Sequence, residues 1–286
     1  MALGLALVAG AVMTSCGDTP GSGPAISPLR NTPTLTPVAP ERTPTEVPTA
    51  EPTGKRPGES EVGTLMPVVR HGARGTKKIA LTFDADLTAA MRKRLTSGKV
   101  KSYYNAELIG NLRRLKVPAT LFLTGMWMEQ YPGRTRELAA DPLFELATHS
   151  YAHKAFTKDC YTLASVPKRA MLSDVRHAVT ILDRLDPDAT RWFRFPGGCY
   201  DGTALHELAP ARLTAVQLDV AGADGFAKSA RSIVDQVVRN AKGGSIVVLH
   251  MHGGDTAPLT GKAVEPIVRK LRAQGYQLVT VTDLMS

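Results

Sequence analysis

The sequence predicts an α/β fold in which about seven β/α repeats form a distorted (β/α) barrel. Residues 79–83, Ile-Ala-Leu-Thr-Phe, are a continuous apolar run, typical of a strand buried on both faces of a parallel sheet. Strand-like runs and helical patterns then alternate with short connections, which implies parallel strands and right-handed crossovers. Polar side chains follow most of these runs, at the edge where such folds gather catalytic groups.

The first 63 residues are expected to lie outside the barrel. Residues 2–13 are small and apolar, are too few to span a bilayer, and lead into Thr14-Ser15-Cys16-Gly17. Residues 1–16 resemble a bacterial lipoprotein signal with Cys16 as the lipidated residue, although Met13 stands where Leu is usual. The alternative is a secretory signal cleaved elsewhere, and both interpretations predict export.

Residues 17–63 are rich in Pro, Thr, Gly and Ser and contain few large apolar side chains, so we expect a disordered linker. Residues 64–286 form one globular domain of roughly 220 residues, a usual size for an α/β barrel.

Charge and cysteine content constrain the partners and the compartment. The net charge of +9 is scattered and aromatic residues make up only 6%, which argues against nucleic-acid binding and leaves a weak preference for anionic wall polymers. Cys160 and Cys199 remain as an even pair, which suits either a disulfide in an oxidising compartment or two buried thiols.

Each element is predicted from its own pattern. Strands are short β-favouring runs, expected at residues 79–86, 119–124, 144–148, 191–195, 213–220, 245–250 and 277–281. Helices show apolar residues at helical spacing, with Pro118 after the first and Gly243-Gly244 after the fifth, and are expected at residues 108–115, 135–140, 166–185, 203–208, 229–241 and 263–273.

The strand ends carry the candidate site. The groups that follow five of the strands are Asp84 and Asp86, His149 and His153, Arg194, Asp219 and Asp224, and His250. Each one alone could be a cap or a surface residue, but their coincidence at one edge predicts a site. His149 and His153 have the spacing of metal ligands, and one helical turn would place them on the same side.

These motifs resemble the polysaccharide deacetylase family, carbohydrate esterase family 4. The similarity is carried by Thr82-Phe83-Asp84, His149 with His153, Arg194-Phe195-Pro196-Gly197-Gly198, Asp224 and Leu249-His250, with residues 117–125 similar to the family's second strand. The resemblance implies a distorted (β/α) barrel that hydrolyses acetyl groups with a divalent metal, zinc in the first place and cobalt or nickel as alternatives.

The same resemblance assigns roles. His149 and His153 hold the metal, Asp84 is the general base and His250 is the general acid. Arg194 pairs with the base, and Asp224 pairs with the acid and raises its pKa.

One position departs from the family pattern, Thr-Phe-Asp-Asp-Gly, whose second Asp is the third metal ligand. This chain has Ala85 there. Asp86 shares the strand face of Asp84 and is the expected third ligand, with a helix N-cap as the alternative. Among the remaining candidates, His252 is expected to be a loop residue, with a place in the lining of the pocket as the alternative. Trp127, Tyr151 and Trp192 are packing residues or sugar-stacking residues.

The predicted function is removal of N-acetyl groups from an extracellular polysaccharide, with peptidoglycan amino sugars as the first candidate and chitin oligomers or O-acetylated xylan as alternatives. We expect a monomer at the cell surface, anchored through lipid at Cys16 or secreted. The alternative from another class is an inactive carbohydrate-binding lipoprotein that lost activity through Ala85.

Overall fold

The computed structural model describes residues 54–286 of the chain. The expected signal at residues 1–16 and most of the expected linker lie outside the described residues. The last part of that linker contacts the domain, because Arg56 forms an ion pair of 2.7 Å with Asp183 and the Ser60 hydroxyl donates to the carbonyl of Leu213.

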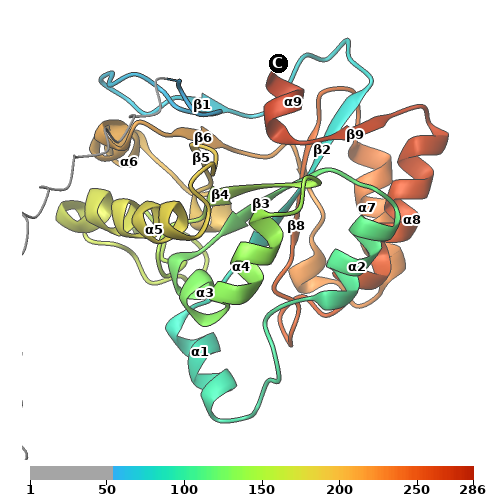
Figure 1. Ribbon diagram of the computed structural model, residues 1–286, viewed down its shortest axis with the longest axis horizontal. Helices are drawn as coiled ribbons and strands as arrows, with labels where there is room; N and C mark the ends of the chain where they lie inside the picture. Colours follow the sequence, from blue (N-terminus) through green and yellow to red (C-terminus); the bar gives the residue numbers. More distant parts are fainter. Residues whose placement is uncertain (1–53) are drawn as a thin grey trace, which may run out of the picture. The chain divides into compact units, whose positions relative to one another are not determined.

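Within the described part of the chain, one parallel sheet of nine strands forms the centre of the fold (Figure 1). The strands are β1 (Val68–Val69), β2 (Lys78–Ala85), β3 (Ala119–Leu123), β4 (Phe144–Thr148), β5 (Trp192–Phe193), β6 (Thr214–Val216), β7 (Val220–Ala221), β8 (Ile246–His250) and β9 (Gln277–Val279). Their order is β1-β6-β5-β4-β3-β2-β8-β7, and β9 pairs with the start of β2. The predicted distorted barrel is confirmed as a curled half-barrel, whose edge strands are β1 and β7.

Helices cover the outside of the sheet. In Figure 1, α2, α7 and α8 group beside β2 and β8, whereas α5 and α6 lie toward β5 and β6. The helices are α1 (Ala89–Thr96), α2 (Ala106–Arg114), α3 (Gly125–Gln130), α4 (Pro132–Ala139), α5 (Met171–Leu185), α6 (Gly202–Leu208), α7 (Ala230–Asn240), α8 (Thr260–Ala273) and α9 (Val281–Met285). No helix of residues 54–286 has both the length and the apolar character needed to cross a membrane.

Strand β2 fixes the position of the site, because its two faces pack against different groups of side chains. Ile79, Leu81, Phe83 and Ala85 are buried in the large core cluster shared with the helices. The alternate residues face the other way, where Ala80 packs in a smaller cluster with side chains of β3, β4, β6, β8 and β9. Since side chains alternate along a strand, Asp84 continues this inner face at the carboxyl end of β2.

The strand expected at residues 213–220 is two strands with different neighbours. β6 lies between β1 and β5, whereas β7 pairs with β8. Asp219 lies between them, forms an ion pair of 2.6 Å with Arg74 and accepts a hydrogen bond from the amide of Ile246. The expectation that Asp219 joins the site edge was wrong, because this carboxylate ties down the amino end of β8.

Candidate active site

Asp84 and Arg194 form the innermost pair of the site. Arg194 is 1% exposed and donates from Nη1 to Oδ1 of Asp84 over 2.6 Å. Its Nε donates to the carbonyl of Val216, and the guanidinium stacks 3.9 Å from the centre of the Phe122 ring. A buried guanidinium held at three sides fixes the direction of the adjacent carboxylate.

Asp86 follows β2 directly and lies among imidazoles. Its carboxylate oxygens are 3.5 Å from Nε2 of His149 and 3.4 Å from Nε2 of His153. Asp86 is not the helix N-cap, because Thr88 caps α1 and accepts from the amide of Met91. The departure at Ala85 therefore places an apolar side chain in the core and leaves the next residue to face the two histidines.

The orientation of His149 is fixed by the main chain. Its Nδ1 lies 2.8 Å from the carbonyl oxygen of Arg194, and a carbonyl only accepts, so Nδ1 carries the proton. In the neutral imidazole this contact leaves the lone pair on Nε2, which points toward Asp86, and this is the tautomer of a metal-ligating histidine. His153 reaches the same place through a turn in which Ser150 and His153 have positive φ values of 67° and 53°. The helical turn expected between the two histidines was wrong, but their rings do converge, with centroids 5.0 Å apart.

These three residues fit a divalent cation. One ligand atom from each of Asp86, His149 and His153 lies within 4.8 Å of the others. Oδ1 of Asp86 is buried without a hydrogen-bond partner, a costly state for a carboxylate oxygen that has no cation beside it. Two imidazoles and a carboxylate are a ligand set that suits zinc and related metals.

His250 and Asp224 form a second pair on the other side of Asp86. Nδ1 of His250 donates to Oδ1 of Asp224 over 2.8 Å, and Nε2 points to the site, 3.9 Å from Oδ2 of Asp86. Asp224 is held in turn by the amide of His250 and by the hydroxyl of Thr260. The imidazole is 30% exposed, so its free nitrogen is accessible from the hollow outside.

The cluster shifts the acidity of its members in opposite directions. Burial alone would raise the pKa of Asp86, but the surrounding imidazoles, His153 first, hold it well below its usual range. Burial lowers the pKa of His153 to about 4. Burial also opposes the charged form of His250, yet the Asp224 carboxylate raises its pKa to about 10. The site thus contains one imidazole that stays neutral and one that carries a proton at neutral pH.

A hollow of about 530 Å³ opens over these residues. Tyr161 and Phe226 line it, and they are the most exposed large apolar side chains among residues 54–286, at 80% and 86%. Tyr161 follows Cys160, which forms a disulfide with Cys199, and Phe226 is two residues beyond Asp224. Both rings are therefore carried by segments that are anchored to the site.

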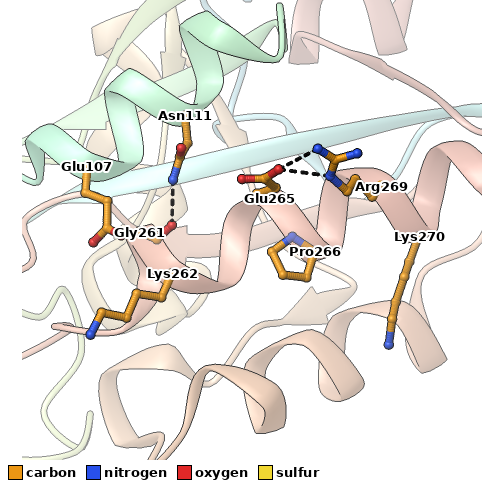
Figure 2. Close-up of a pocket in the computed structure, with 8 residues that line it drawn as sticks. All are labelled: Glu107, Asn111, Gly261, Lys262, Glu265, Pro266, Arg269 and Lys270. Atoms are coloured by element: carbon orange, nitrogen blue, oxygen red, sulfur yellow. Dashed lines mark hydrogen bonds and ion pairs between the residues drawn. The ribbon is translucent and has the colours of Figure 1, made fainter.

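A second hollow of about 660 Å³ lies between α2 and α8 (Figure 2). It is lined by the salt-bridged pair Glu265 and Arg269 and by Asn111, which donates to the carbonyl of Gly261. Glu265 and Arg269 pair with each other on the outer surface of α8, and none of the residues that line this hollow belongs to the candidate metal cluster of residues 54–286.

The seven residues expected to act as ligand, base, acid or partner of these groups lie together at the site, whereas Asp219 does not. His252 lies in the loop after β8, as expected, and it also lines the hollow, where it is 3% exposed and its Nδ1 lies 3.6 Å from Oδ2 of Asp86. Trp127 and Trp192 are buried packing residues, and Tyr151 stacks on His177 outside the hollow. Tyr161 and Phe226 were missed, since exposure of an aromatic ring depends on tertiary structure.

Known proteins resemble this chain in sequence, and solved structures resemble it in fold. The peptidoglycan-N-acetylmuramic acid deacetylase of Bacillus subtilis is 24% identical over 208 residues, which are 73% of this chain and 38% of that protein. A peptidoglycan-N-acetylglucosamine deacetylase of Bacillus cereus is 27% identical over 184 residues, 64% of this chain and 82% of that protein. The chain thus spans less than half the length of the first of these relatives.

Among solved structures, a peptidoglycan N-acetylglucosamine deacetylase superposes with a TM-score of 0.64 at 22% identity, covering 76% of this chain and 92% of that one. A pseudoenzyme of carbohydrate esterase family 4 from Bacillus anthracis superposes with a TM-score of 0.61 at 20% identity, covering 77% and 69%. The family model described as polysaccharide deacetylase matches residues 71–216, just over half of the 286 residues. The chain belongs to the polysaccharide deacetylase family.

Proposed function

We propose that the protein is an exported, metal-dependent deacetylase that removes N-acetyl groups from the amino sugars of peptidoglycan. The observation that carries this proposal is the arrangement of two opposed pairs, Asp84 with Arg194 and Asp224 with His250, around Asp86 and its histidines. Amide hydrolysis needs a base on one side of the scissile bond and an acid on the other.

Asp86, His149 and His153 would hold the divalent cation, with zinc as the first candidate and cobalt or nickel as alternatives. Such a cation lowers the pKa of water and polarises the acetyl carbonyl. The His149 tautomer set by the Arg194 carbonyl and the neutral His153 keep two nitrogen lone pairs available for it.

Asp84 is the proposed general base. Its Oδ1 is engaged by Arg194, which leaves Oδ2, 3.7 Å from Nε2 of His149, to accept a proton from the attacking water. The new C–O bond and the broken C–N bond then yield acetate and an amine. His250 gives its Nε2 proton to the departing nitrogen, and the Asp224 carboxylate stabilises the protonated imidazole beforehand.

The surroundings of the site support a polysaccharide substrate. Tyr161 and Phe226 present exposed aromatic faces at the hollow, and such faces bind the apolar faces of sugar rings. The curated relatives are named as deacetylases of peptidoglycan and, in one case, of chitooligosaccharides. Peptidoglycan is therefore the first candidate, ahead of chitin oligomers and O-acetylated xylan.

Export is part of the proposal. The disulfide between Cys160 and Cys199 supports an oxidising compartment, since such bonds persist outside the cytosol. We propose a monomer that is anchored through lipid at Cys16, with residues 17–63 as a linker that lets the domain reach wall glycans, or that is secreted.

The test is acetate release by the purified protein from N-acetylated peptidoglycan, chitin oligomers and acetylated xylan. We expect release from peptidoglycan that a chelator abolishes and zinc or cobalt restores. Faster release from the xylan ester would make the protein an O-acetyl esterase. Glycan binding without acetate release would instead support a binding protein, in line with the pseudoenzyme that has the same fold.

A further inference from the structure

His252 contacts the main chain of Asp86. The amide of Asp86 donates to Nδ1 of His252 over 3.3 Å, and both residues are buried. Because an amide N–H can only donate, Nδ1 must be the unprotonated nitrogen in this contact.

This contact takes the place of a missing strand hydrogen bond. The pairing of β2 with β8 ends at Asp84 and His250, where the amide of Met251 donates to the carbonyl of Asp84 over 2.7 Å. In a parallel ladder, the next amide of β2 to face β8 belongs to Asp86 and would donate to a main-chain carbonyl. Here the His252 ring accepts that hydrogen bond, two residues after the last paired position.

The opposite side of the same turn is held by Thr124. Its hydroxyl donates to the carbonyl of Ala85 over 3.0 Å and accepts from the amide of Leu87 over 3.1 Å. Thus the main chain on either side of Asp86 is fixed by one side chain from the β3 end and one from the β8 end.

The need for such support follows from the place of Asp86. It lies beyond the last residue of β2, where ladder bonds no longer orient the chain, and its Oδ1 has no hydrogen-bond partner. Without a fixed main chain, the carboxylate would lose the direction that brings it to His149 and His153.

We propose that His252 is a positioning residue that fixes the main chain of Asp86 and thereby aims its carboxylate at the metal site. This inference rests on the metal site of the proposed function. It applies to this chain because its third ligand is Asp86, one residue later than in the family pattern.

Two substitutions in the full-length protein test whether the hydrogen-bond acceptor of His252 matters or only the volume of its side chain. His252→Leu keeps the volume and removes the acceptor, whereas His252→Asn keeps an acceptor oxygen near the position of Nδ1. Zinc affinity, measured by competition with a chromogenic chelator, should fall about 10- to 100-fold in His252→Leu and stay within a few fold of wild type in His252→Asn. His177→Leu removes a histidine outside the hollow and should leave the affinity unchanged.

The competing explanation is that His252 has a purely structural role. Both substitutions would then lower the melting temperature of the metal-free protein, and their zinc affinities would not differ from each other. Wild-type affinity in His252→Leu, or an equal loss in both variants, would overturn the inference alone. A wild-type protein that binds no zinc would overturn the proposed metal site and this inference together.

Discussion

Arg194 and Asp84 form a buried ion pair of 2.6 Å between the carboxyl ends of β5 and β2, 110 residues apart in the chain. The pair uses Oδ1 of the carboxylate and leaves Oδ2 toward the histidines. Because Arg194 occupies Oδ1, Asp84 can act as the base through Oδ2. Asp86, two residues further along the same face, is the proposed metal ligand.

Asp84→Asn should therefore lower the turnover of N-acetylated glycan by at least about 100-fold while the bound zinc stays, because a neutral amide cannot act as a general base. Acetate release and elemental analysis of the same sample measure the two effects. Asp235→Asn, a change on the exposed surface of α7, is the control. Turnover that survives in Asp84→Asn would remove Asp84 from its role.

Asp224→Asn should shift the pH dependence of turnover. The Asp224 carboxylate raises the pKa of His250, so the imidazole is protonated below that pKa and loses its proton as pH rises through it. Without the charge the pKa falls, and the loss of activity on the alkaline side should begin at a lower pH.

A bound cation lowers the same pKa in both proteins, so the difference between the two pH profiles of kcat is the quantity to compare. Identical alkaline limbs in the wild type and in Asp224→Asn would show that His250 is not the acid.

The sequence could predict β2 because a strand buried on both faces is continuously apolar, and it could predict Asp84 because the strand ends there. It could not predict α1, of which only Met91 is buried, or α3, whose buried residues show no amphipathic pattern. The contact of His252 with Asp86 depends on how β8 ends beside β2, which no local pattern records.

Tyr161→Ala and Phe226→Ala should each raise KM for a hexamer of N-acetylglucosamine roughly two- to tenfold, in line with the loss of one stacking contact. The rate constants for a small acetate ester should stay unchanged, because such a substrate does not reach the rings. Leu65→Ala, a change of an exposed apolar residue outside the hollow, is the matched control. Equal KM values for the hexamer in all variants would contradict a sugar-binding role of these rings.

Removal of the disulfide should destabilise the fold. Cys160 and Cys199 are 39 residues apart, and a cross-link over such a loop stabilises by about 2–4 kcal/mol. Gly197 packs closely against the disulfide, since a Cβ added to Gly197 would lie 2.7 Å from Sγ of Cys160. Urea unfolding of the Cys160→Ser, Cys199→Ser double variant should match that of the reduced wild type. Reaction of both Cys160 and Cys199 with a thiol reagent in the untreated wild type, located by peptide mapping, would contradict the cross-link.

The most direct test of the account is the position of zinc in a crystal of the protein, located by anomalous scattering at the zinc edge. We predict one site whose ligands are an oxygen of Asp86 and Nε2 of His149 and His153, each at about 2.0–2.2 Å. Zinc bound through Asp84 in place of Asp86, or no zinc between these residues, would contradict the assignment of base and ligand on which the proposed function depends.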